Sequence, residues 1–168
     1  MGTAKTADIK YMMLRNRLGI ANALLEQTPE RTQTTNEEVE INLSKTAKLW
    51  EGYMASPMSL EEAQLAKTYA DKRAQFVQEG IEPALAALRV SNYPEAKRIM
   101  LEKIRPGFDV ARTAADVLLK YQLNEAKTNF ETNSDRFQAI RAVSITLIAL
   151  GLLFAVLFDG LLMRGVTV

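Results

Sequence analysis

The stretch that decides the fold is residues 107–126, GFDVARTAADVLLKYQLNEA. A seam with a period of about 3.5 residues runs through it at Phe108, Ala111, Ala115, Leu118, Gln122 and Ala126. This period is typical of a helix in a left-handed bundle or coiled coil. Nothing between Gly107 and Arg141 breaks the pattern, so we expect one long helix that begins near Pro94. Pro106 should kink it near its start, because proline removes one ladder hydrogen bond.

Helical periodicity also dominates the residues upstream, and no alternating strand pattern occurs. A capping box formed by Thr35 and Glu38 follows a polar turn at residues 32–36, and Gly80 and Pro83 are expected to bend the third helix. The predicted helices cover residues 7–27, 37–54 and 60–88. With the long helix they predict an all-α fold, an antiparallel up-down-up-down four-helix bundle whose fourth helix is continuous with a transmembrane helix.

The transmembrane helix is predicted from the uncharged run 142–158. With Asp159 and its neighbours the run reaches 22 residues between Arg141 and Arg164, and about 20 are needed to cross a bilayer. The alternative is a buried core helix. The predicted domains are therefore a sensor bundle at 1–140, a transmembrane helix at 141–164 and the start of a cytoplasmic linker at 165–168.

Composition excludes several functions. The chain has 21 basic and 20 acidic residues, so it offers no basic field for nucleic acid, and we expect no nucleic-acid partner. Cysteine and histidine are both absent, which rules out thiolate metal sites, haem on a histidine, and Ser-His-Asp or Cys-His catalysis. No catalytic constellation stands out. We expect no enzyme activity, no metal site and no cofactor.

Arginines are the candidate ligand-binding residues. Arg98, Arg105 and Arg112 are seven residues apart, which predicts one face of the fourth helix, and Thr113 adds a hydroxyl beside Arg112. Arg15 and Arg17 on the first helix should lie at about the height of Arg105, roughly 15–18 Å below the bundle tip. Guanidinium groups bind carboxylates bidentately, so this set predicts a site for an organic acid. A solvated basic face is the alternative.

The order of these features resembles the four-helix-bundle sensor domain of bacterial methyl-accepting chemotaxis receptors, the class with the aspartate and serine receptors. Residues 16–20, Asn-Arg-Leu-Gly-Ile, resemble the family's Asn-Arg-Ala-Gly-Ile stretch. Residues 47–53, which end in Trp50-Glu-Gly-Tyr53, resemble its Ala-x-x-x-Trp-x-x-Tyr pattern, and Pro57 follows in the turn. The resemblance covers nearly the whole chain.

The resemblance implies a periplasmic homodimer in the inner membrane, with the effector bound where the first helices of two subunits meet. Arg17 matches one of the family's ligand-binding arginines. Ala21 stands where the family has a second arginine, which weakens the case for aspartate as the ligand. Arg15, Arg105, Arg112 and Thr113 are added from their predicted face and height. The family also has a membrane helix before the bundle, so we expect this chain to be part of a longer receptor.

The sequence therefore predicts a chemoreceptor sensor that binds a small organic acid and signals through a helix shift to a cytoplasmic kinase complex. Other readings stay open. The same bundle could serve a membrane histidine kinase, which would make the intact protein an enzyme. The chain could instead be a tail-anchored cytosolic adaptor that binds protein helices, or a structural coiled coil without a ligand.

Overall fold

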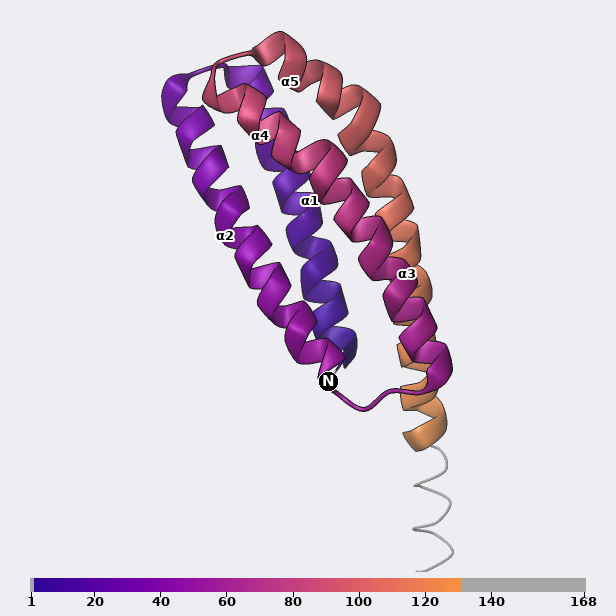
Figure 1. Cartoon of the computed structure of the whole chain (residues 1–168). Coiled ribbons are helices and arrows are strands. Elements are labelled where there is room, and N and C mark those ends of the chain that lie inside the picture. Colours follow the sequence, from indigo (N-terminus) through magenta and orange to yellow (C-terminus); the bar gives the residue numbers. More distant parts are fainter. Residues whose placement is uncertain (1, 131–168) are drawn as a thin grey trace, which may run out of the picture. The chain divides into compact units, whose positions relative to one another are not determined.

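The computed structural model describes residues 2–130, and every element in that range is helical. The elements are α1 (Gly2–Glu26), α2 (Pro29–Met54), α3 (Leu60–Phe76), η1 (Val77–Ile81), α4 (Glu82–Arg89), α5 (Tyr93–Ile99) and η2 (Met100–Ile104). Residues 105–130 continue as helix. Figure 1 shows α1 and α2 as an antiparallel pair, and α3 to α4 returning alongside them. The predicted up-down-up-down bundle is confirmed.

Two predicted helix starts were wrong. The first helix begins at Gly2, and the second begins at Pro29, so the polar stretch 32–36 is helix. Thr28 caps α2 because its side chain accepts a hydrogen bond from the backbone N–H of Arg31, and proline suits the first helical position. The capping box predicted at Thr35 does not form. Thr35 is buried, and its hydroxyl lies 3.4 Å from the carbonyl oxygen of Gly19 on α1.

The bends predicted in the third and fourth helices take the form of π turns. Pro83 lies two residues after η1, and Pro106 lies two residues after η2. Proline lacks an N–H and its ring crowds the carbonyl four residues earlier, so a wider local turn accommodates it. The two π turns contact each other across the bundle. A Cβ placed on Gly80 would lie 3.0 Å from Cγ1 of Ile104, which is why the smallest residue occupies this contact.

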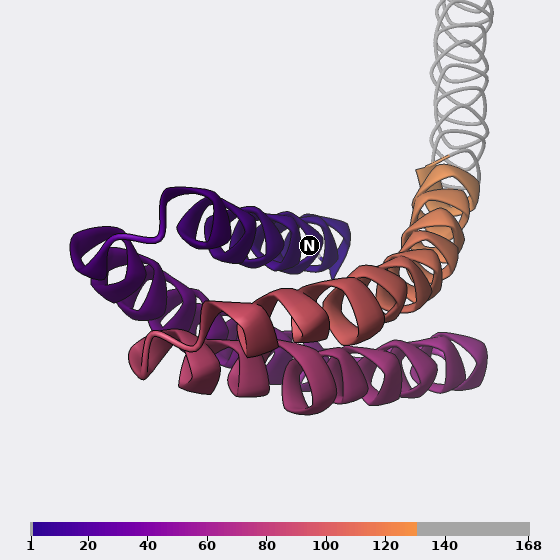
Figure 2. The ribbon, with the colours of Figure 1, turned by 90° about the horizontal axis from the view of Figure 1, so that it is seen from above.

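The core follows the predicted seam of the long helix. Phe108, Ala111, Ala115, Leu118 and Gln122 are all buried. The other helices contribute the buried side chains Ile9, Met13, Ile20, Val39, Tyr53, Tyr69, Phe76, Leu85 and Leu88. The view in Figure 2 shows α1 beside the helix that continues from α5, an adjacency that the contacts of α1 with α5 and η2 support.

Within residues 2–130 no helix is both long and apolar enough to cross a bilayer. The transmembrane helix predicted at 141–164 lies outside the described residues, as does the predicted linker at 165–168. Their structure therefore stays a prediction.

Candidate ligand-binding surface

The two arginines of α1 point in different directions, as their two-residue spacing implies. Arg17 is half-buried, and its Cζ lies 4.9 Å from the centre of the Phe108 ring. This contact brings Arg17 to the helix that carries Arg105 and Arg112. Arg15 is exposed and borders a shallow depression between α1 and α2, together with Leu18. The predicted arginine set is thus divided between two sides of α1.

The candidates on the long helix are all exposed. Arg112 lies 3.9 Å from Asp116, which also pairs with Lys10 of α1. The hydroxyl of Thr113 donates to the backbone carbonyl of Asp109 at 2.8 Å. Arg105 forms no ion pair with any residue in the described part of the chain. One acidic group, Asp116, therefore lies among these cations.

The prediction that Arg98 shares a face with Arg105 and Arg112 was wrong. The π turn η2 lies between Arg98 and Arg105, and it holds one residue more than an α-helical turn. A seven-residue spacing across it therefore does not return a side chain to the same stripe. Arg98 is instead held by Glu95 and Glu102 at 2.7 and 2.6 Å, and these hydrogen bonds raise the pKa of Arg98 above its ordinary value.

An outward-facing apolar seam on α1 was missed in the sequence. It repeats with alternating spacings of three and four residues, and its members are exposed or half-buried: Ala4, Ala7, Tyr11, Leu14, Leu18, Ala21 and Leu25. Leu18 is 52% exposed and Leu25 is 82% exposed. We call these seven residues the α1 seam. The heptad pattern of the α1 seam is present in the sequence, but the prediction of the first helix used only the inward-facing stripe through Ile9, Met13 and Ile20.

Basic side chains flank the α1 seam. Lys10 and Arg17 each come one residue before a seam position, and Arg15 comes one residue after one. In coiled coils, such flanking positions lie beside the partner helix and carry charged groups. The α1 seam with its three cations is therefore a surface suited to a second helix and to an anion held at its edge.

Comparison with protein families places the chain in a known group. Residues 2–126 match the model of the Tar ligand binding domain homologue. The chain belongs to this family. Comparison with curated proteins and with solved structures gave no significant match. The Tar ligand binding domain is the helical periplasmic domain of membrane chemoreceptors, and the family is one of sensors and not of enzymes. The resemblance inferred from the sequence is thereby confirmed, and residues 2–126 form a chemoreceptor sensor domain.

Proposed function

We propose that this Tar-type sensor domain works as a homodimer in the inner membrane and binds a small organic carboxylate where two α1 helices meet. The observation that carries the proposal is the α1 seam, because seven regularly spaced apolar positions lie on the outside of the described bundle. A regular seam of this kind buries itself against an identical helix in a two-stranded coiled coil. A parallel pair of α1 helices is the arrangement that two subunits anchored in one membrane would adopt.

The charges beside the α1 seam favour an anion as the ligand. In a parallel pair, Lys10 and Arg17, which each precede the first seam position of a heptad, face the residue five positions later in the other subunit. Lys10 would then face Arg15 of the partner subunit. Two like charges at this place destabilise the pair, and a carboxylate between them removes that repulsion. Asp116 already pairs with Lys10. A bound carboxylate would therefore stabilise the dimer mainly through its interaction with Arg15.

Arg17 and the long helix would complete the site on the other edge of α1. Arg17 lies against Phe108, and the side chains of Arg105, Arg112 and Thr113 are exposed on the same helix. A ligand that contacts α1 of one subunit and the long helix of the other would favour one relative position of these helices. Helix shifts at such interfaces are about 1–2 Å. The long helix precedes the proposed membrane segment 141–164, so its shift would reach a cytoplasmic kinase complex.

A thermal-shift screen tests the proposal directly. The whole chain in lipid nanodiscs is incubated with succinate, malate, citrate and aspartate, and its melting temperature is measured. A ligand at 100 times its Kd stabilises by about 2.7 kcal/mol, which is an easily measured rise. Arg15→Gln and Arg17→Gln should each remove the rise, whereas Arg89→Gln, at an exposed arginine of α4, should keep it. A rise that survives both α1 substitutions would place the ligand elsewhere.

A further inference from the structure

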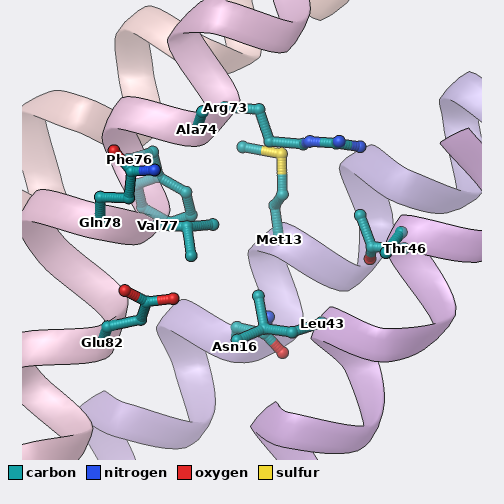
Figure 3. Close-up of a pocket in the computed structure, with 11 residues that line it drawn as sticks. Met13, Asn16, Leu43, Thr46, Arg73, Ala74, Phe76, Val77, Gln78 and Glu82 are labelled. Atoms are coloured by element: carbon teal, nitrogen blue, oxygen red, sulfur yellow. The ribbon is translucent and has the colours of Figure 1, made fainter.

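A cavity distinct from the shallow depression beside Arg15 lies on the opposite side of α1 from the α1 seam. It has a volume of about 240 Å³ and lies among α1, α2, α3, η1 and the first residue of α4 (Figure 3). Met13 and Asn16 line it from α1, and both are core-facing positions that do not belong to the α1 seam. Ala47 of α2 and Ala74 of α3 line it as well, and both are exposed, so the cavity opens to solvent between these two helices.

Arg73 gives this cavity a positive group that has no acidic partner in the described part of the chain. Its Nη1 atom is buried and has no hydrogen-bond partner within the described residues, and none of the ion pairs found there includes Arg73. The Cζ atom lies 4.9 Å above the Trp50 ring and 5.9 Å from the Tyr69 ring. Burial lowers the pKa of Arg73, but a guanidinium remains charged at neutral pH. The aromatic rings fix the group in place without satisfying the N–H donors of Nη1.

The rest of the lining indicates which acids would fit. Figure 3 shows the Arg73 side chain along one edge of the cavity and Glu82 on another side, with apolar groups of Met13, Leu43 and Val77 between them. One cation and one anion favour a ligand with a single carboxylate, because a second carboxylate near Glu82 would be repelled. The volume is below the roughly 300–1,000 Å³ of drug-sized sites, so the ligand must be small.

We infer that each protomer holds its own binding site for a small monocarboxylate with an apolar body, in which Arg73 receives the carboxylate. The site is separate from the proposed dimer interface and does not depend on it. Asn16, which is 2% exposed, and Thr46 add polar groups to the wall of the same cavity. Phe76 lines the cavity and meets Phe108 edge to face at 6.0 Å, so an occupant would contact a side chain that packs on the long helix.

Trp50 is the only tryptophan of the chain, which makes its fluorescence a local probe of Arg73. The whole chain in nanodiscs is titrated with benzoate, phenylacetate and 3-methylbutanoate, and with succinate and uncharged benzamide as controls. We expect a saturable change in Trp50 fluorescence with at least one monocarboxylate and none with benzamide. Arg73→Met should raise the Kd on the order of 10- to 100-fold, because it removes a charge-assisted hydrogen-bond donor while keeping the apolar stem.

Two further variants keep the test decisive. Ala47→Leu fills the opening from an exposed helical position, so the fold does not depend on it, and it should also weaken binding. Arg98→Met, at the exposed bundle tip, should leave the titration unchanged. No fluorescence response to any monocarboxylate, or a response that both Arg73→Met and Ala47→Leu preserve, would overturn the inference. Arg17→Gln should have no effect here, which separates this site from the proposed interface site.

Discussion

The guanidinium of Arg17 on α1 lies 4.9 Å from the centre of the Phe108 ring on the long helix. Phe76 of α3 packs against the same ring, with ring centres 6.0 Å apart. Phe108 therefore connects the long helix to α1 and α3. Its contact with α1 is a cation–π interaction worth about 0.5–2 kcal/mol. A side chain with this position should matter for stability more than any exposed neighbour on its own helix.

Phe108→Ala should lower the free energy of unfolding by about 3–5 kcal/mol, because it removes a buried aromatic ring and leaves a cavity. Val110→Ala on the same helix is the matched control, since Val110 is exposed and should change stability little. Urea unfolding followed by circular dichroism measures both. Equal effects of the two substitutions would contradict the central position assigned to Phe108.

Gly80→Ala should destabilise the bundle by about 1–3 kcal/mol, although alanine is the better helix former. The new Cβ would lie 3.0 Å from Cγ1 and 3.4 Å from Cα of the buried Ile104. Gly19→Ala is the control, because its Cβ meets only Thr35 at an ordinary 3.6 Å. Thermal unfolding should show a lower Tm for the first variant and an equal or higher Tm for the second.

Thr28→Ala should cost about 1 kcal/mol by removing the cap of α2. The Thr28 hydroxyl accepts from the N–H of Arg31 at 3.2 Å, whereas the hydroxyl of Thr34 only donates to the carbonyl of Glu30 inside the helix. Thr34→Ala should therefore be neutral or slightly stabilising. Denaturation midpoints of the two variants decide between a cap at residue 28 and a helix that starts later.

Alkaline pH should weaken the fold through Tyr69. Burial raises its pKa to about 12, with Arg73 acting in the opposite direction, while an unfolded tyrosine titrates near 10. Between these values the unfolded chain has lost a proton that the folded chain keeps, so stability falls as pH rises. The loss should reach about 2–3 kcal/mol near pH 12. Tyr69→Phe should be less sensitive to pH over this range, and an identical pH profile would be evidence against the buried, neutral hydroxyl.

Leu18→Glu should abolish self-association, because it puts a charge within the apolar α1 seam. The control is Val90→Glu, at a residue that is 73% exposed and lies outside α1. Sedimentation velocity of the two variants should show a monomer and a dimer, respectively, with unchanged circular dichroism. A dimer that persists in Leu18→Glu would remove the support for an α1 interface.

The sequence was sufficient to predict much of the fold. The period of the long helix predicted the buried positions from Phe108 to Gln122, and the residues around Trp50 identified the family. The start of α2 was missed because Thr32, Thr35 and Asn36 are typical cap residues. Their side chains are buried in the structure, where Asn36 donates to the carbonyl of Thr32 at 2.8 Å. Tertiary packing outweighed their local preference.

The candidate site was predicted less completely. Heptad spacing placed Arg98 with Arg105, but this inference assumes an uninterrupted α-helix, and sequence spacing does not reveal a π turn. Arg73 was overlooked because Trp50 and much of the cavity lining come from α1 and α2, which are distant from it in sequence. Its contact with Trp50 and the cavity beside it exist only once α1, α2 and α3 are packed together, whereas its contact with Tyr69 lies within α3.

The two π turns also bear on the history of the chain. A π turn is what remains when one residue is inserted into an α-helix and the helices on both sides keep their original faces. Here η1 and η2 contact each other, and each is followed by a proline at the same distance. Relatives with straight helices should therefore align with a one-residue gap in 77–81 and another in 100–104. Deletion of a single residue at either place should restore an ordinary helix without exchanging core and surface.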